Sequence, residues 1–317
     1  NIGIPSLLKK YMEKAIVIMS TYNGEHYIRE QIDTILNQKD VNVSLIVRDD
    51  GSSDNTPAIL REYSSRFNNI IPIFQQNTGC KKSFFLAAKA ASALDGGYFA
   101  FSDQDDFWMP DKLSAAIHRI KQAELSNHSI PLLYFCAPEI VDKNLNPIGK
   151  TWNNSHYLSF EEALMAQPCA GCTMVFNRKA LELFLLGNPD KMSMHDSWMY
   201  KTVLACSGKV IEDPAPHIKY RQHGHNVIGT GSFASRWKRR FLNFTGNSCY
   251  RSGQAGALLE TYSDMMPENT RETAYALSHY KKLGVSNKLK VMLNPAFKTK
   301  SVIHNLLFRT AILFNRF

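Results

Sequence analysis

The chain has 317 residues, of which 44% are apolar and 21% charged, which is the balance of a globular protein and not of a disordered one. No apolar run approaches the roughly 18 residues that a membrane-spanning helix needs, and we expect no signal peptide at the start. The six cysteines lack the spacing of a disulfide framework, and the pair Cys169-x-x-Cys172 has no second pair with which to bind zinc. Reduced thiols in a cytosolic protein are therefore expected.

The net charge of +9 is unevenly distributed along the chain. Residues 1–217 carry 21 Lys and Arg against 24 Asp and Glu, a net charge of −3. Residues 218–317 carry 16 against 4, a net charge of +12. A neutral-to-acidic body with a basic C-terminal third favours phosphate-rich partners, namely nucleic acid, an anionic membrane surface or a lipid pyrophosphate.

Four apolar runs alternate with helical patterns up to residue 101, after an N-terminal extension (1–11) that we expect to lie outside the fold. The expected strands cover 15–19, 43–47, 70–74 and 98–101, and the expected helices cover 25–37, 59–63 and 83–94. Continuous apolar strands with short helical connections are typical of a parallel sheet that has helices on both faces. The predicted fold class is therefore α/β, with a doubly wound open sheet.

Polar residues follow three of these strands, at the point where each strand ends. The three clusters are Thr21-Tyr22-Asn23, Asp49-Asp50 and Asp103-Gln104-Asp105. Because ligands bind at the carboxyl ends of the strands in such sheets, we expect the clusters to converge on one site. Carboxylates in an Asp-x-Asp turn suit Mg²⁺ or Mn²⁺, with phosphate oxygens as further ligands. The alternative for the acidic turn alone is a solvated turn with a helix-capping Asp.

The sequence from residue 132 to residue 226 is less regular. Strands are expected at 132–136, 139–142, 172–176, 209–211 and 218–221, and helices at 159–167, at 181–185 and after His195. The first two of these strands lie on either side of Pro138. We place the end of the main domain (12–226) where the chain becomes basic and mainly helical (227–317).

Two interpretations of this C-terminal region stay open. Basic and aromatic residues are interleaved at 233–244, and 255–284 and 300–315 are helical in pattern. The last segment, 302–314, is apolar over much of its circumference and is flanked by basic residues. It is predicted either as an interfacial membrane helix or as a docked helix that contacts the body or another subunit of a homo-oligomer.

Four motifs occur in the order found in the family 2 inverting nucleotide-sugar glycosyltransferases of the GT-A fold, which this chain resembles. They are Ser20-Thr21-Tyr22-Asn23-Gly24, Asp49-Asp50-Gly51-Ser52-Ser53-Asp54-Asn55-Thr56, Ser102-Asp103-Gln104-Asp105-Asp106 and His195-Asp196-Ser197-Trp198. Each motif alone is weak, and their common order over residues 15–226 carries the resemblance. The stretches 101–108, 195–198 and 220–226 are most similar to the bacterial rhamnosyltransferase-like branch, which builds cell-surface polysaccharides.

The resemblance implies a Rossmann-like, mostly parallel open sheet and a role for each motif. The residues implied in binding the base and ribose are Thr21, Tyr22, Asn23, Glu25, Asp103 and either Asp50 or Asp49. Asp105, with His223, would bind the Mn²⁺ or Mg²⁺ ion on the diphosphate. Asp196 would be the general base, and an ordinary helix N-cap is the alternative. The acceptor-site candidates are Trp108, Trp198 and His195, with core packing as the alternative for both tryptophans.

The implied reaction is transfer of a sugar to a glycan or a lipid-pyrophosphate acceptor, with dTDP-rhamnose favoured as donor over a UDP-hexose. Such an enzyme would act in the cytoplasm, attached peripherally to the inner face of the membrane. Nucleic acid is not expected as a partner, because it would leave the acidic site without a purpose. A sugar nucleotidyltransferase would need a Gly-rich triphosphate loop, which Thr21-Tyr22-Asn23-Gly24 is not. A non-catalytic sugar-binding module would have lost the metal and base residues, which are present.

Overall fold

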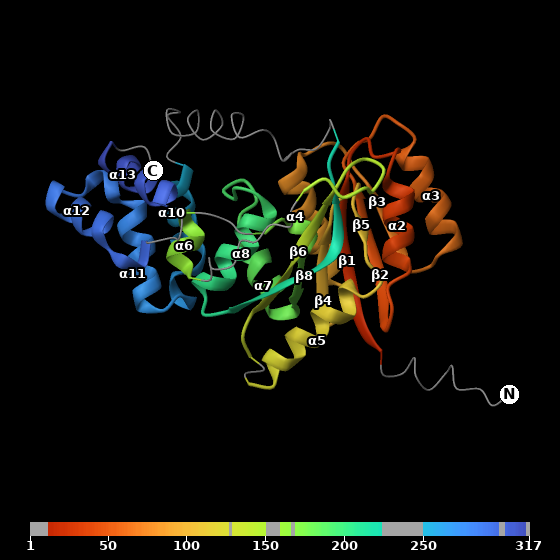
Figure 1. Cartoon of the computed structure of the whole chain (residues 1–317), viewed down its shortest axis with the longest axis horizontal. Coiled ribbons are helices and arrows are strands. Elements are labelled where there is room, and N and C mark those ends of the chain that lie inside the picture. Colours follow the sequence, from red (N-terminus) through yellow and green to blue (C-terminus); the bar gives the residue numbers. More distant parts are fainter. Residues whose placement is uncertain are drawn as a thin grey trace.

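The computed structural model describes residues 12–126, 129–149, 159–165, 169–223, 250–297 and 302–314. Within them, one open sheet has its strands in the order β3-β2-β1-β4-β7-β6-β8-β5. Helices cover both faces of this sheet, and the C-terminal helices lie at the end of the molecule remote from β3 (Figure 1). The predicted α/β architecture with a helical C-terminal region is confirmed.

The first half of the sheet is parallel throughout. Its elements are β1 (Glu13–Thr21), α2 (Ile28–Leu36), β2 (Val41–Asp49), α3 (Thr56–Arg66), β3 (Ile70–Phe74), α4 (Cys80–Ser92) and β4 (Tyr98–Ser102). Thr21 pairs with Asp49, and Met19 pairs with Ser102. Because three parallel strands end at this level, the loops that follow Thr21, Asp49 and Ser102 leave the sheet at one edge, as predicted.

The second half of the sheet is mixed. Its elements are β5 (Phe107–Trp108), α5 (Lys112–Glu124), β6 (Leu132–Val141), α6 (Phe160–Met165), the 3-10 turn η2 (Gly171–Thr173), β7 (Met174–Asn177), α7 (Arg178–Leu186), α8 (His195–Ala205) and β8 (Lys209–Arg221). Strand β7 is antiparallel to both β4 and β6, β5 is antiparallel to β8, and β6 and β8 are parallel. The short antiparallel β7 brings η2 to the carboxyl end of β4.

Two strands that we predicted as interrupted are continuous. Strand β6 runs through Pro138, and β8 joins the segments expected at 209–211 and 218–221. The register between them shifts on both sides of Ala137, which pairs with Pro216. A proline removes one donor from the ladder, and the register shift at this point absorbs that loss without ending either strand.

Alternate residues of each central strand enter two separate cores. Ile16 and Ile18 belong to the hydrophobic cluster on one face, whereas Ala15, Val17 and Met19 belong to the cluster on the other, and none is more than 1% exposed. This follows from the period of two in a strand, which sends successive side chains to opposite faces. Both faces of β1 are therefore dry, and only its polar end reaches the site.

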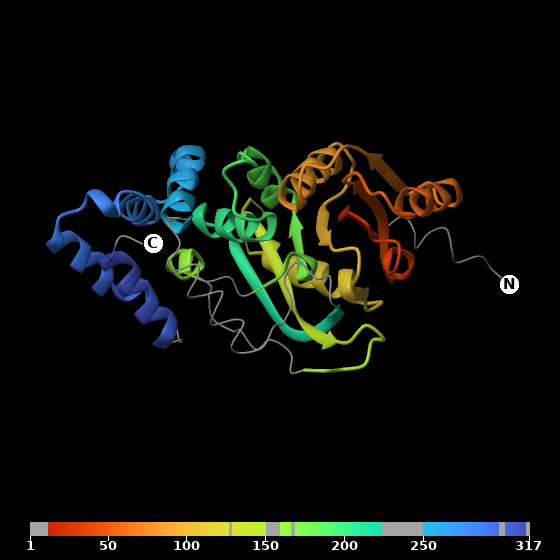
Figure 2. The same ribbon diagram turned by 90° about the horizontal axis from the view of Figure 1, so that it is seen from above.

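The C-terminal helices extend the first of these cores. They are α10 (Tyr250–Tyr262), α11 (Glu268–Ser278), α12 (Val285–Leu293) and α13 (Val302–Leu313), with short 3-10 turns between them. Leu258, Tyr262 and Phe308 are buried in the same cluster as Ile16. Figure 2 shows these helices beyond α8, with α12 and α13 side by side. No helix in the described parts of the chain is long and apolar enough to cross a membrane.

Asn177, at the junction of β7 and α7, provides a test of how the fold is held together. Its Oδ1 accepts hydrogen bonds from the backbone N–H groups of Ala180 (3.1 Å) and Leu132 (3.0 Å), and its Nδ2 donates to the Ile130 carbonyl (3.0 Å). Asn177→Ala removes a helix cap and leaves buried backbone groups unpaired, so we expect a loss of about 2–3 kcal/mol in the free energy of unfolding, measured in urea. Asn188→Ala, at an exposed turn, is the control and should change stability by at most about 0.5 kcal/mol. Equal effects of the two substitutions would contradict this account.

Candidate active site

The loops after β1 and β2 are hydrogen-bonded to each other. The backbone N–H of Asn23 donates to Ser52 Oγ (2.9 Å), and the N–H of Ser53 donates to Asn23 Oδ1 (2.9 Å). The Glu25 carboxylate accepts from Asn55 Nδ2 at 2.7 Å. Asn23 adopts a φ of 48°, in the left-handed region that Asn tolerates better than most residues. Two predicted nucleotide-binding residues, Asn23 and Glu25, thus hold the shape of the loops themselves.

Gln104 joins the acidic turn to the first loop, a role that the sequence did not indicate beyond its place within a motif. Its Oε1 accepts from Thr21 Oγ1 (2.6 Å) and from the N–H of Tyr22 (2.9 Å), and its Nε2 donates to the Tyr22 carbonyl (3.2 Å). A Cβ at Gly24 would lie 2.5 Å from Gln104 Oε1, so any larger residue here would displace the Gln104 amide from this bridge. The Tyr22 side chain remains 50% exposed beside this bridge.

Asp49 and Asp50 are both buried, and each orients a different loop. Asp49 accepts from the N–H and the hydroxyl of Ser52. Asp50 forms an ion pair with the buried guanidinium of Arg48 and accepts from the N–H groups of Thr78 (2.9 Å) and Gly79 (2.9 Å). Gly79 has a φ of 82°, which an L side chain rarely adopts. The role of either carboxylate toward a base stays a prediction.

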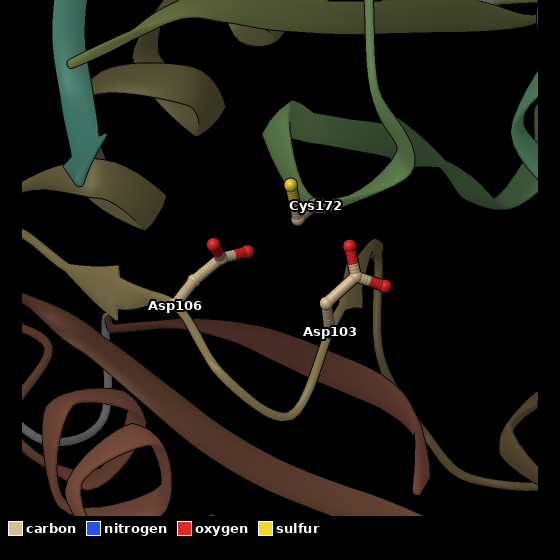
Figure 3. Close-up of side chains that lie close together, drawn as sticks. All are labelled: Asp103, Asp106 and Cys172. Carbon is tan, nitrogen blue, oxygen red and sulfur yellow. The ribbon is translucent and has the colours of Figure 1, made fainter. Parts of the chain in front are cut away.

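The acidic turn after β4 directs two carboxylates toward a thiol. Figure 3 shows Asp103, Asp106 and Cys172 converging, and their ligand atoms lie within 4.8 Å of one another. Desolvation, and then the negative charges of Asp105 and Asp196, raise the pKa of Asp103 to about 7. Burial raises the pKa of Asp106 well above its ordinary value. Removal from water thus favours the neutral form of both groups in the absence of a cation.

Asp106 does not cap the helix that follows it. Its Oδ1 accepts from the N–H of Arg221 (3.3 Å), and in the described part of the chain its Oδ2 has no hydrogen-bond partner. The residue before helix α5 is Asp111, whose side chain makes no capping bond. The alternative of a solvated turn with a helix-capping Asp is therefore wrong for Asp106, because the turn directs its carboxylate into the protein.

Asp105 and His223, the two predicted metal ligands, are in direct contact. Asp105 Oδ2 lies 2.7 Å from His223 Nε2, and the Tyr27 ring stacks on the imidazole with centroids 4.9 Å apart. Arg221 Nε donates to the Asp105 carbonyl (2.8 Å), and the same guanidinium pairs with Glu30. The end of β8 is thereby held against the acidic turn. A carboxylate and an imidazole form a donor set that fits Mn²⁺ and, less well, Mg²⁺.

Lys112 is a buried cation behind the acidic turn that sequence reasoning missed. Its side chain is 0% exposed, and its Nζ lies 3.3 Å from the centre of the Trp108 ring. Burial lowers the Lys112 pKa to about 8, while the nearby Cys136, Cys172 and Asp106 act in the opposite direction. A lysine in an amphipathic helix usually lies on the solvated face, so its position in the sequence carried no signal.

Asp196 lies in the first turn of α8 and is 8% exposed. Its Oδ2 accepts from the N–H of Gly171 (3.2 Å), and its Oδ1 accepts from the N–H of Ser197 (2.6 Å). Each oxygen of the Asp196 carboxylate therefore has a backbone donor, which fixes the direction of the side chain at the start of α8. A Cβ at Gly171 would lie 2.6 Å from His195 Nε2, so the close approach of η2 to α8 requires glycine here.

The three acceptor-site candidates are packed in the core. Trp108, Trp198 and His195 are 1%, 0% and 4% exposed. Trp198 Nε1 donates to Tyr262 Oη (3.2 Å), and that hydroxyl donates to the Leu183 carbonyl (2.8 Å). The His195 ring stacks on Phe84 with centroids 3.7 Å apart. The core-packing alternative therefore describes both tryptophans in this structure, and none of the three offers a free surface to an acceptor.

The model of the glycosyl transferase family 2 matches residues 16–184, which is more than half of the chain. The dTDP-rhamnosyl transferase RfbG of Shigella flexneri is 32% identical over 244 residues, which are 74% of this chain and 81% of that protein. The chain therefore belongs to glycosyl transferase family 2, and it is a glycosyltransferase.

Solved structures of other glycosyltransferases share the fold. S. aureus TarS 1–349 in complex with UDP-GlcNAc has a TM-score of 0.53 at 15% identity and covers 96% of this chain and 92% of its own. The mannosyltransferase PcManGT from Pyrobaculum calidifontis, in complex with GDP-Man and Mn²⁺, has a TM-score of 0.51 at 16% identity, with 97% and 81% covered. At these identities the likeness shows the fold alone, and it confirms the predicted GT-A architecture.

The buried His195 makes stability depend on pH in a defined window. Burial lowers its pKa from 6.5 to about 4, and neither ring nitrogen has a hydrogen-bond partner in the described part of the chain. The unfolded chain takes up the proton first as the pH falls, because its imidazole has the higher pKa. The free energy of unfolding therefore carries no penalty from His195 above about pH 6.5, and it decreases by about 3 kcal/mol as the pH falls toward 4. His195→Gln should remove that part of the pH dependence, which is measured by urea unfolding at a series of pH values. An unchanged pH dependence in the variant would contradict the buried, neutral imidazole.

Proposed function

We propose that the protein is an inverting rhamnosyltransferase, which moves rhamnose from dTDP-rhamnose to a glycan or lipid-linked acceptor in surface polysaccharide synthesis. The identity to a dTDP-rhamnosyl transferase over most of both chains supports the choice of donor. The observation that carries the reaction type is that the 3-10 turn η2 connects the α8 carboxylate to the strand-end carboxylates: the N–H of Gly171 donates to Asp196, and the next residue, Cys172, converges with Asp103 and Asp106. A metal-assisted displacement needs a group of metal-binding carboxylates and a separate basic carboxylate close to them.

The nucleotide would bind along the loops after β1 and β2. The half-exposed ring of Tyr22 provides a surface on which a base can stack. Thr21, Asn23 and Glu25 would provide polar contacts to the base and ribose, directly or by holding the loop. Asp50, or Asp49 in its place, would accept the imide N–H of thymine or uracil, and Asp103 would bind the ribose.

Asp105 and His223 would hold a divalent ion, Mn²⁺ or Mg²⁺. When bound, such an ion offsets the negative charge that develops on the leaving nucleoside diphosphate. Arg221 forms an ion pair with Glu30 and donates a hydrogen bond to the Asp105 carbonyl. These two contacts support the role, because they fix the backbone of the acidic turn against the end of β8. Pre-oriented ligands lower the cost of forming the site.

Asp196 would take the proton from the acceptor hydroxyl as that oxygen attacks the anomeric carbon. In a direct displacement the base lies opposite the leaving group, so the product has inverted configuration. The N–H groups of Gly171 and Ser197 each donate to one oxygen of the carboxylate. These bonds fix the direction of the carboxylate, and its remaining lone pairs are left for the acceptor.

The acceptor would be presented at the inner face of the cell membrane, to which the basic region 227–317 would attach the main domain 12–226. The excess of 16 basic over 4 acidic residues after position 217 supports an anionic surface as partner. The basic and aromatic stretch 233–244, with Arg236 and Arg240, lies outside the described residues. Subunit contact within a homo-oligomer is the competing role for this region.

The assignment of the base is tested by Asp196→Asn, which keeps the shape of the side chain and removes its basicity. Turnover of dTDP-rhamnose should fall by about 10²–10⁴-fold while dTDP affinity is retained. Asp190→Asn, an exposed carboxylate before the same helix, is the matched control and should keep full turnover. Near-normal turnover in Asp196→Asn, or a product with retained configuration by NMR, would rule out this mechanism. A donor panel with UDP- and GDP-sugars in the same assay tests the preference for dTDP-rhamnose.

A further inference from the structure

The last two helices expose an unusual amount of apolar surface. Fourteen large apolar side chains are exposed in the described chain, and half of them lie between residues 285 and 314. These seven are Val285, Leu289, Leu293, Val302, Leu306, Leu313 and Phe314. Scattered exposed apolar residues are ordinary, but a concentration of this kind in one part of a protein marks an interaction surface.

On α12 the exposed residues form one stripe. Val285, Leu289 and Leu293 are 74%, 44% and 66% exposed, and they follow one another at intervals of four residues. At about 100° per residue they cover an arc of about 80° on the helix. Val291, which is 8% exposed, lies on the opposite side and packs into the core. The stripe is therefore the outward face of a helix that is already docked by its other face.

Helix α13 repeats this arrangement more sharply. Val302, Leu306 and Leu313 are 79%, 61% and 52% exposed and lie within an arc of about 40°. Phe308 and Ile312 lie on the other side and are buried, at 3% and 0% exposure. Burial of that side in the core explains why the helix is apolar there. Nothing in the described chain covers the outward stripe.

The charge around these stripes has one sign. No acidic residue follows Glu272 in the sequence. The basic residues beyond it are Lys281, Lys282, Lys288, Lys290, Lys298, Lys300, Arg309 and Arg316. Lys281, Lys290 and Arg309 are exposed. An anionic partner would gain from the exposed charges of Lys281, Lys290 and Arg309, whereas a second copy of the same face would be repelled.

We infer that the outward faces of α12 and α13 dock on the surface of an anionic lipid bilayer. The Leu and Val side chains enter the boundary between headgroups and acyl chains, and the Lys and Arg side chains reach the phosphates. Both views show these two helices next to each other at the end of the molecule opposite β1–β3 (Figures 1 and 2). The inference deepens the proposed function by naming the membrane-binding surface, and it rests on that function only for the purpose of the attachment.

The experiment is co-sedimentation of the full chain with vesicles of phosphatidylcholine alone and of phosphatidylcholine with phosphatidylglycerol, at low and at physiological salt. We expect binding to the anionic vesicles alone, weakened by salt. The variant Leu293→Glu with Leu306→Glu should reduce partitioning at least tenfold. Leu125→Glu, which changes a residue 80% exposed at the end of α5, is the matched control and should bind as the wild type does.

A second variant tests the charges separately. Lys281→Glu with Lys290→Glu should lower partitioning by about fivefold or more per changed residue, since each cation near an anionic surface contributes about 1 kcal/mol. In both variants hydrolysis of the soluble donor should be unchanged, so a failure of the docking surface is distinguishable from a failure of the proposed reaction. All the substituted side chains are exposed or on helix surfaces, and thermal unfolding verifies that the variants fold.

Two results would overturn the inference. One is wild-type vesicle binding by the Leu293→Glu, Leu306→Glu variant. The other is that the wild-type chain does not bind anionic vesicles at low salt. This holds if the chain sediments as a monomer, and equally if it sediments as an oligomer that Leu293→Glu with Leu306→Glu dissociates. In the oligomer case the stripes are a contact between copies of this chain.

Discussion

The burial of several carboxylates at the carboxyl edge of the sheet is the constraint on which the rest of the site depends. Asp49 and Asp50 lie at the end of β2, and Asp103, Asp105 and Asp106 follow β4 on the other side of β1. An unpaired charge that is buried in such a position costs several kcal/mol. The protein offsets these charges with Arg48, which pairs with Asp50, and with the buried Lys112, whose charge acts on Asp103 and Asp106, while Arg221 holds the backbone of the acidic turn. Burial nevertheless raises the pKa of Asp103 and of Asp106, so both groups favour the neutral form in the absence of a cation.

The position of the α8 carboxylate depends on packing that begins far away in the chain. Asp196 lies at the start of α8. Trp198, two residues further along the helix, donates a hydrogen bond to Tyr262 of α10. Helix α10 therefore contacts α8, the helix that bears the proposed base, through Trp198. The N–H of Gly171 separately holds the Asp196 carboxylate. A region outside the part of the chain that the family model matches thus contributes to the geometry of the site.

The local patterns of the sequence were sufficient for the four parallel strands β1 to β4, for the convergence of three strand ends and for the start of α8 at the His195-Asp196 motif. Tertiary burial decided the rest. Lys112, Trp108 and Trp198 have side chains whose type does not reveal whether they face water, and all three proved to be fully buried. Strand β6 continues through Pro138 because a register shift against β8 accommodates it, and only the pairing of the two strands reveals that. The antiparallel β7 likewise depends on strand order, which no local pattern encodes.

The most direct test of the account is a calorimetric titration of dTDP, with UDP for comparison. Each nucleotide is titrated into three samples, which are the wild-type protein with Mn²⁺, the wild-type protein after chelation of the metal, and the Asp105→Ala variant with Mn²⁺. The account predicts that dTDP binds in the presence of Mn²⁺ and that affinity falls sharply after chelation and in the variant, while the variant keeps its fold. Binding that is equally tight without metal, or no binding of either nucleotide to the wild-type protein, would contradict the assignment of the strand-end carboxylates as a metal-assisted nucleotide-sugar site.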